Sequence, residues 1–301
     1  MMLWGIDLGG TKIEGVVLKS ASEPDVLVRK RIATEQEHGY QHILGRIKKL
    51  IDKMATEIGH APEKVGIGTP GTLDPKTQML KNSNTVCLNG QPIKKDLESL
   101  IGAKITIAND ANCFALAEAK MGVVKSKGID AEVVFGVIMG TGVGGGLVVN
   151  GKIINGRHGI GGEWGHNFLD ESGGQCYCGQ VGCVETVICG PFTQRYYTSL
   201  TGKEKKLQDI VALHREGSDP NATKTINRLT HFFGKAISVV IDIVDPDVVV
   251  IGGGVGNIDE LYTDGVNSAR NFVFNDDLQT IFLKPELGDS AGVFGAAMLV
   301  S

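Results

Sequence analysis

Two stretches of this sequence, far apart in the chain, follow the same plan. Residues 3–18, LWGIDLGGTKIEGVVL, are a short apolar run, a Gly-Gly-Thr turn and a second apolar run, and residues 133–149, VVFGVIMGTGVGGGLVV, repeat this order. Each pattern predicts a β-hairpin whose glycines permit a tight turn and the close approach of a ligand to the backbone. The spacing of about 130 residues indicates two domains of related construction, the usual organisation for a chain of 301 residues.

Patterns typical of strands and helices alternate through the rest of the chain. Periodic apolar residues predict helices, and short β-branched runs predict strands. The predicted elements are a helix at 40–58, strands at 65–67 and 105–108, helices at 111–121 and 225–244, a strand at 248–251 and a last helix at 291–300. This alternation predicts an α/β protein.

One histidine and three cysteines gather in a short polar segment. They are His166, Cys176, Cys178 and Cys183. Thiolates and a neutral imidazole are the ligands that Zn²⁺ prefers, and four of them close a tetrahedral structural site. A lone histidine is usually a satisfied core or surface residue, but three neighbouring cysteines favour metal ligation. The other cysteines, Cys87, Cys113 and Cys189, are isolated and are expected to be small buried hydrophobes.

Three glycine-rich turns are candidate ligand-binding loops, and the first two suit phosphates. Residues 7–12, DLGGTK, offer an acid, backbone N–H groups, a hydroxyl and a cation, which suits nucleotide phosphates with Mg²⁺ near Asp7. The alternative for this segment is a hairpin turn with a surface lysine. Residues 140–146 hold five glycines in seven positions and form a second candidate. Residues 252–254 follow a buried strand, where α/β folds place ligands, although a simple turn is the alternative.

Three acidic residues are candidates for chemistry or substrate binding. Asp110 follows Asn109 at the end of a predicted strand and begins a helix, a position typical of an N-cap. Because two phosphate loops need a nearby base, we favour Asp110 as the general base that accepts a proton from an attacking hydroxyl. Glu163 and Glu185 flank the cysteine cluster. Most glutamates are surface acids, but we predict that these two bind sugar hydroxyls.

Charge and composition exclude several classes of partner. The net charge of -4 and the pI near 6.0 predict no nucleic-acid binding. The most apolar stretch, residues 133–149, contains six glycines and is not expected to span a membrane. The amino terminus, MMLWGIDLGG, lacks a basic region and is typical of a first strand, not of a signal peptide. With a metal-binding cysteine pattern, this predicts a cytoplasmic protein.

Seven segments together resemble the ROK family, which holds bacterial sugar kinases and related repressors. The segments are DLGGTK at 7–12, GTPG at 68–71, ANDAN at 108–112, GTGVGGG at 140–146, GEWGH at 162–166, CYCGQVGCVE at 176–185 and DPDVVVIGGG at 245–254. They cover nearly the whole chain in the expected order, and the cysteine segment is highly specific.

The resemblance implies a fold and an activity. The expected fold is an actin-like, hexokinase-like (ribonuclease H-like) α/β fold, in which ATP and sugar meet in the cleft between two domains. We expect a small domain at residues 1–118, completed by the C-terminal helix at 290–301, and a large domain at 119–289. The implied activity is ATP- and Mg²⁺-dependent phosphorylation of a sugar 6-hydroxyl, with a structural Zn²⁺. We also expect a homodimer.

The resemblance also implies a role for individual residues. Asp110 would be the catalytic base. The sugar would be bound by Gly71, Asn84, Asn109, Asp110, Glu163, His166 and Glu185. ATP and its metal would be bound by Asp7, Gly9, Gly10, Thr11, Lys12, Gly140, Thr141, Gly142, Gly253 and Gly254. Zinc would be bound by His166, Cys176, Cys178 and Cys183.

Different segments point to different sugars. Residues 81–97, KNSNTVCLNGQPIKKDL, look like the corresponding stretch of fructokinases with mannokinase activity. Residues 110–116 and 140–147 look equally like N-acetylglucosamine kinases. We expect a fructose or mannose kinase, with N-acetylglucosamine kinase second and glucokinase also possible within the family. A non-catalytic sugar sensor is the alternative of another class, and the presence of Asp7, Lys12 and Asp110 argues against it. A zinc-ribbon module for nucleic acid is disfavoured by the acidic charge.

Overall fold

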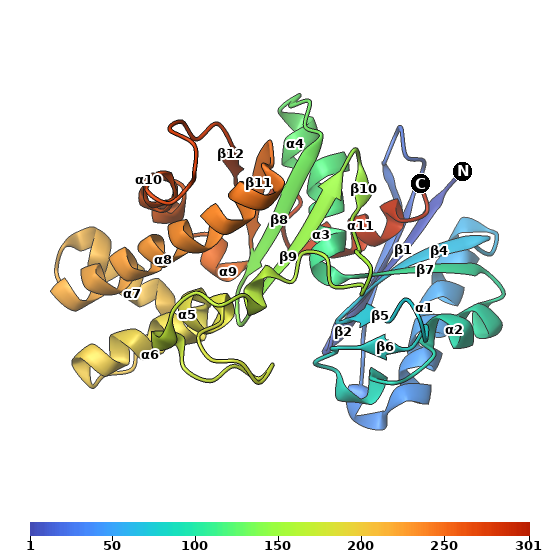
Figure 1. The fold of residues 1–301 in the computed structure, drawn as a ribbon. Coiled ribbons are helices and arrows are strands. Elements are labelled where there is room, and N and C mark those ends of the chain that lie inside the picture. The colour runs from blue at the N-terminus through green and yellow to red at the C-terminus, as the bar shows by residue number, and fades with distance from the viewer. The chain divides into compact units, whose positions relative to one another are not determined.

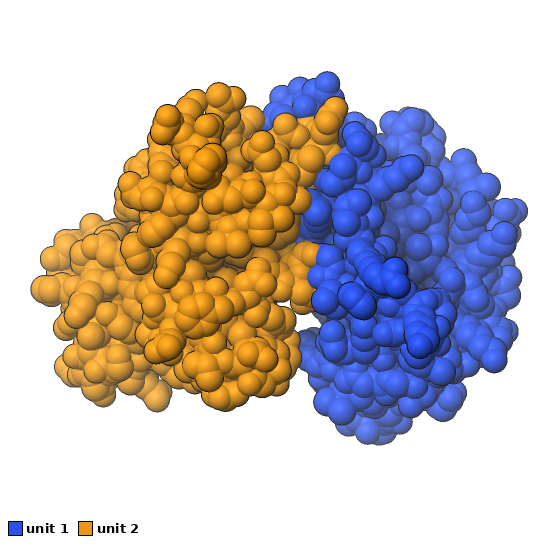
Figure 2. Space-filling view, viewed as in Figure 1, with its two compact units in different colours: residues 1–130, 146–161, 286–301 blue, residues 131–145, 162–285 orange.

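The computed structural model describes residues 1–301 and divides into two compact units, coloured separately in Figure 2. Unit 1 contains residues 1–130, 146–161 and 286–301. Unit 2 contains residues 131–145 and 162–285. None of the helices combines the length and the apolar character that crossing a lipid bilayer requires.

Unit 1 is built on a five-stranded mixed sheet with the order β3-β2-β1-β4-β7. The strands are β1 (Leu3–Leu8), β2 (Lys12–Leu18), β3 (Val26–Ala33), β4 (Lys64–Thr69) and β7 (Lys104–Asn109). β2 pairs antiparallel with β1, as the first predicted hairpin requires, and β3 pairs antiparallel with β2. β4 and β7 are parallel to β1. The other elements are α1 (Tyr40–Ile58), β5 (Thr72–Leu73), β6 (Leu80–Lys81), α2 (Ile93–Ile101), α3 (Asp110–Lys120), α4 (Val123–Ser126), β10 (Lys152–Ile153) and α11 (Ala291–Met298).

Side chains of β1 alternate between the two faces of this sheet. Trp4 and Ile6 lie in the apolar core that α1 and α2 cover. Gly5 faces the other way, toward α11, where an added Cβ would lie 2.5 Å from the Val293 carbonyl oxygen. Asp7 shares that face, because a Cβ on Gly292 of α11 would lie 3.2 Å from the Asp7 carboxyl carbon. Figure 1 shows α11, in red, beside β1. The two-residue period of the strand therefore turns Asp7 away from the apolar core.

The boundary of unit 1 differs from the expected one. The first domain was expected to end at residue 118, whereas unit 1 continues to Asp130 and also takes residues 146–161. Glu118, which is fully buried, explains the first difference. Its carboxylate accepts hydrogen bonds from the backbone N–H groups of Val123 (2.9 Å), Glu286 (3.2 Å) and Leu287 (3.0 Å). These bonds join α4 and the segment before α11 to the end of α3, so residues beyond 118 remain part of unit 1.

Unit 2 is helix-rich, and its strands belong to a second five-stranded sheet with the order β10-β9-β8-β11-β12. The strands that begin in unit 2 are β8 (Val133–Met139), β9 (Val143–Val149), β11 (Val248–Gly252) and β12 (Ile281–Leu283). Its helices are α5 (Val184–Ile188), α6 (Gly190–Thr201), α7 (Leu207–Glu216), α8 (Pro220–Val244), α9 (Gly253–Gly256) and α10 (Asp264–Arg270). β11 lies parallel to both β8 and β12.

Helix α8 is the long helix against which α5, α6, α7 and α10 pack. It begins at Pro220, five residues before the predicted start at Thr225. Asp219 caps it, since its side chain accepts from the backbone N–H groups of Asn221 and Ala222, and proline is well suited to the first helical position. The helix ends at Val244 as predicted, because Asp245 adopts a left-handed conformation with φ 43°.

Candidate active site and metal centre

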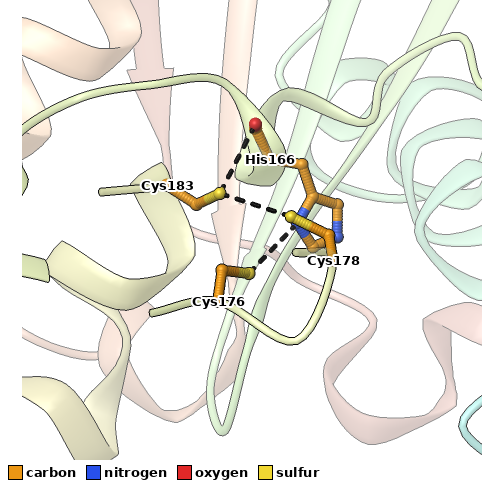
Figure 3. A group of neighbouring side chains, drawn as sticks. All are labelled: His166, Cys176, Cys178 and Cys183. Carbon is orange, nitrogen blue, oxygen red and sulfur yellow. Dashed lines mark hydrogen bonds between the residues drawn. The ribbon is translucent and has the colours of Figure 1, made fainter. Parts of the chain in front are cut away.

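The predicted metal ligands come together in unit 2. His166 ends the short 3₁₀ helix η3 (Trp164–His166), and Cys183 directly precedes α5. One ligand atom from each of the four residues lies within 4.8 Å of the others. The Sγ atoms of Cys178 and Cys183 are 3.6 Å apart, and Nδ1 of His166 is 3.7 Å from Sγ of Cys176 (Figure 3). A tetrahedral zinc site with metal–sulfur bonds of about 2.3 Å has edges of about 3.8 Å, so this donor set fits Zn²⁺.

Backbone contacts and glycine place the ligands. The N–H of Cys176 donates to the Gln180 carbonyl at 2.9 Å and closes the turn that carries Cys178. Gly182 has φ 76°, and a Cβ there would lie 2.6 Å from the Asp170 carbonyl oxygen. No other residue type fits this position without a shift of the backbone. These contacts bring the cysteine ligands into one compact loop.

The pKa values of the three cysteine thiols are shifted in different directions. Desolvation raises the pKa of Cys183 to about 12 and also raises that of Cys176. A hydrogen bond from the Gln180 backbone lowers the pKa of the exposed Cys178 thiol. Because zinc binds thiolates, loading the site must release protons from the two buried cysteines.

Glu185 joins the metal loop to the second glycine-rich turn. Its Oε2 accepts a hydrogen bond from the Val143 N–H at 3.0 Å. A Cβ on Gly142 would lie 2.3 Å from the same oxygen, so a larger residue there would displace the Glu185 carboxylate. The N–H of Gly190, at the start of α6, donates to the Gly140 carbonyl at 2.9 Å. A residue predicted to bind sugar and a turn predicted to bind ATP are thus neighbours within unit 2.

The third glycine segment lies beside the same turn. Gly252 of β11 pairs with Ile138 of β8, the strand that leads into Gly140. Gly253 has φ 82°, and a Cβ there would lie 2.3 Å from the Met139 carbonyl oxygen. The segment was expected to be a loop but forms the one-turn helix α9. Gly253 and Gly254 are exposed, so their backbone is open to a ligand.

The first glycine-rich turn belongs to unit 1. The Gly9 N–H donates to the Lys12 carbonyl at 3.0 Å and closes the turn. Thr34 holds it from the side, because its hydroxyl donates to the Gly9 carbonyl at 2.6 Å and its N–H to the Thr11 carbonyl at 3.0 Å. Thr34 was not predicted from the sequence, and no local motif marks it. Thr11 is exposed, with Gly10 and Lys12 half-buried, so the turn is accessible.

Asp110 begins α3 without capping it. Asn109 is the N-cap residue, because its side chain accepts from the Asn112 N–H at 2.7 Å. The Asp110 Oδ1 accepts from the neighbouring Ala111 N–H at 2.8 Å. The Asp110 side chain is open to solvent, yet the surrounding protein is dense enough that desolvation raises the pKa of its carboxyl. A raised pKa makes the carboxylate a stronger proton acceptor, and the structural role that competed with this one belongs to Asn109.

Two more predicted sugar ligands lie in unit 1, near the hairpin of β5 and β6. Gly71 has φ 86°, and a Cβ there would lie 2.4 Å from the Lys81 carbonyl oxygen. Asn84 is exposed between the buried residues Ser83 and Thr85. Asn89, which was not predicted, holds this loop: its side chain accepts from the Ser83 N–H at 2.8 Å and donates to the Ser83 carbonyl at 2.9 Å. The Asn89-Gly90 pair was a turn signal that could have found it.

The structure assigns the predicted site residues to both units. Those in unit 1 are Asp7, Gly9, Gly10, Thr11, Lys12, Gly71, Asn84, Asn109 and Asp110. Those in unit 2 are Gly140, Thr141, Gly142, Glu163, His166, Glu185, Gly253, Gly254 and the three cysteines of the metal cluster. Each unit thus carries at least one glycine-rich turn and residues predicted to bind sugar.

Tyr177, between two cysteines of the cluster, was also missed by sequence reasoning. Its hydroxyl is 3.0 Å from Nε2 of His166, and the two rings meet edge to face with centroids 5.1 Å apart. The surrounding protein, followed by the negative charges of Glu185 and Glu163, raises the pKa of Tyr177 to about 12. The charges of both glutamates that were predicted to bind sugar therefore affect the pKa of the tyrosine hydroxyl.

Asp7 predicts a measurable pH dependence of stability. Burial, followed by the negative charge of Asp110, raises its pKa to about 6. The folded state therefore binds this proton more tightly than the unfolded chain, and the resulting stabilisation is complete below about pH 4 and lost as the pH rises through 6. Without nucleotide or Mg²⁺, we expect Asp7→Asn to be more stable than wild type by about 1–3 kcal/mol at pH 7 and nearly equal at pH 4.

Thermal unfolding of both proteins from pH 4 to pH 8 measures this difference. Asp52→Asn is the matched control, because that exposed aspartate pairs only with Lys48 on the same helix. Wild-type and Asp7→Asn curves that run parallel across the whole pH range would contradict the prediction.

Known proteins resemble this chain over nearly its whole length. The model of the ROK family matches residues 3–301. The N-acetyl-D-glucosamine kinase of Aliivibrio fischeri is 36% identical over 308 residues, covering 99% of each chain. That of Pasteurella multocida is 34% identical over 309 residues, with the same coverage.

Solved structures show the same fold. The ROK hexokinase of Thermus thermophilus superposes with a TM-score of 0.87 at 29% identity, covering 99% of this chain and 97% of that one. A ROK glucokinase from Streptomyces griseus, solved with glucose and AMPPNP, has a TM-score of 0.78 at 26% identity and covers 99% of both chains. The expected hexokinase-like α/β fold is thereby confirmed.

Proposed function

We propose that this chain, which belongs to the ROK family, is an ATP-dependent sugar kinase that transfers the γ-phosphate of ATP to the 6-hydroxyl of a hexose. The observation that carries the proposal is Asp110: a solvent-accessible carboxylate at the start of α3, with a raised pKa and with the capping role taken by its neighbour. Asp7 supports the proposal, because the negative charge of Asp110 helps to raise the pKa of Asp7, so the two carboxyls of unit 1 interact.

In the proposed reaction, Asp110 accepts the proton of the 6-hydroxyl as the hydroxyl oxygen attacks the γ-phosphorus. The bond between that phosphorus and the oxygen bridging to the β-phosphate breaks, and ADP leaves. Asp7 offers the hard oxygen ligands that suit Mg²⁺, which when bound offsets the charge on the phosphates. The backbone N–H groups of the glycine turns and Lys12 would hold the phosphates. Positioning and electrostatics are then the main contributions of the protein.

N-acetyl-D-glucosamine is the sugar that we propose first. Relatives with 32–36% identity across 99% of the chain are N-acetyl-D-glucosamine kinases. This reverses the order expected from residues 81–97, which favoured fructose or mannose. Those sugars remain the second candidate, because that segment forms the loop around Asn84 and its resemblance to fructokinases is local to a predicted sugar ligand.

We also propose that the metal cluster holds one structural Zn²⁺. The donor set and its spacing support this, with Nδ1 of His166 facing the cysteines. Three thiolates and an imidazole close a tetrahedral site, which leaves no open position to activate water. The metal would instead order a loop that contains few buried apolar side chains and ends in α5, the helix that carries Glu185.

A coupled assay of ADP release tests the activity and the sugar together. The panel is N-acetylglucosamine, N-acetylmannosamine, glucose, mannose and fructose, each with ATP and Mg²⁺, and with a control that lacks sugar. We expect kcat/KM for N-acetylglucosamine to exceed the others by about tenfold or more. A higher value for fructose or mannose would contradict the choice of sugar. No turnover with any of the five would contradict the kinase proposal.

A further inference from the structure

Tyr177 occupies an unusual position for an exposed aromatic residue. It stands between Cys176 and Cys178, and its side chain is 82% exposed. Its contacts are with His166: the hydroxyl lies 3.0 Å from Nε2, and the rings meet edge to face at 88°. An exposed tyrosine gains little from apolar burial, so this polar contact decides where the side chain rests.

His166 can make only one hydrogen bond through Nε2 at a time. Nδ1 faces the cysteine cluster, 3.7 Å from Sγ of Cys176. A histidine that binds a metal through Nδ1 carries its one remaining proton on Nε2, so Nε2 is a donor. A single N–H makes one well-aligned hydrogen bond at a time. While the Tyr177 hydroxyl accepts the hydrogen bond from Nε2, no other oxygen can accept it.

We propose that Tyr177 is a gate of the sugar site: its hydroxyl holds the position of a sugar oxygen on Nε2 of His166 and must leave when the sugar binds. This inference rests on the proposed function, in which His166 contacts the sugar. The exposure of the side chain permits the movement, because turning it outward breaks the contact with His166 and no packing in the core. The backbone stays in place, since the Cys176 N–H remains bonded to the Gln180 carbonyl.

The gate makes sugar binding a competition. A sugar must replace the tyrosine hydroxyl, so its net affinity is lowered by the strength of the bond that it displaces. A sugar with an oxygen aligned on Nε2 recovers this loss, whereas one without it does not. Tyr177 would therefore reduce the affinity of every sugar that has to displace its hydroxyl.

The test is Tyr177→Phe, which keeps the ring and removes the hydroxyl. Isothermal titration with N-acetyl-D-glucosamine, without nucleotide, gives the dissociation constant, and elemental analysis gives the zinc content. We expect the dissociation constant to fall about three- to tenfold, as for the loss of one competing hydrogen bond. Zinc content should not change. Val181→Ala is the matched control, because Val181 is an exposed apolar residue of the same loop. This variant should bind sugar with the affinity of the wild-type protein.

Two results would overturn the inference. An unchanged or weaker sugar affinity in Tyr177→Phe, with zinc retained, would show that the hydroxyl is neutral or assists binding. Failure of the wild-type protein to bind any of the five sugars of the assay panel would instead overturn the proposed function, and this inference with it.

Discussion

Replacing Asp110 with asparagine is expected to lower kcat by about 10²-fold or more, while the fold and the affinity for sugar are retained. Asparagine is nearly the same size, and its Oδ1 can still accept from the Ala111 N–H, as Oδ1 of the aspartate does. The helix cap is untouched, because Asn109 provides it. The substitution therefore removes the proton acceptor and little else.

Steady-state kinetics with saturating ATP and sugar measure the effect, and circular dichroism checks the fold. Asp52→Asn is the control for an exposed aspartate far along the sequence from the site. A fall in kcat with KM for sugar within about twofold would fit loss of an interaction made in the transition state. Turnover near the wild-type level would assign the base to another residue.

Elements with strong local patterns were predicted well. Helix α1 spans Tyr40–Ile58 as expected, because its apolar period is regular and glycines flank it on both sides. Gly59 ends it in the left-handed conformation, with φ 89°. The start of α8 was placed too late, although the cap residue Asp219 and the following proline were visible in the sequence. The cap residue and the proline were sufficient to place the start of α8, but the prediction relied on the apolar period alone.

Contacts between distant residues could not be predicted. Glu185 and Val143 are bonded across 42 residues, and Thr34 holds Gly9 across 25. The bonds of Glu118 to Glu286 and Leu287 set a boundary that no composition change marks. Such contacts depend on how strands and helices pack. A sequence pattern of period 2 or 3.6 predicts the type of element, but it does not indicate which distant residue that element will contact.

The candidate site shows the same limit at the scale of single atoms. The cysteine spacing predicted the four metal ligands, but either nitrogen of His166 was compatible with it. The structure turns Nδ1 toward Cys176 and leaves Nε2 with Tyr177. Similarly, the Asn-Asp pair allowed either residue to cap α3, and the geometry gives that role to Asn109. Residue types indicate the chemistry, whereas orientation decides which atom performs it.

Replacing Cys178 with serine is expected to abolish stoichiometric zinc and to raise the KM for sugar about tenfold or more. A serine hydroxyl is a poor zinc ligand, and three remaining ligands hold the metal far less tightly. Cys178 is the exposed member of the cluster, so the substitution leaves the core intact. The loss of zinc frees the loop that carries His166 and leads through Cys183 into α5, where Glu185 lies.

ATP affinity should change by less than about fivefold, although Glu185 bonds to Val143 beside the second glycine-rich turn. That turn also has support of its own: the Gly140 N–H donates to the Gly142 carbonyl at 2.9 Å, and β8 is paired with β11. Loss of one hydrogen bond to such a turn costs about 1 kcal/mol or less. Sugar binding, for which His166 and Glu185 are proposed ligands, would lose the placement of both.

Elemental analysis, sugar KM and nucleotide titration together test this expectation. Val181→Ala is the matched control, because Val181 is an exposed residue of the same loop and is not a metal ligand. If Cys178→Ser loses zinc and keeps wild-type sugar affinity, the metal does not organise the sugar site. If ATP affinity falls as far as sugar affinity, the metal loop supports both sites equally through Glu185, and the separation argued from the pairing of β8 is wrong.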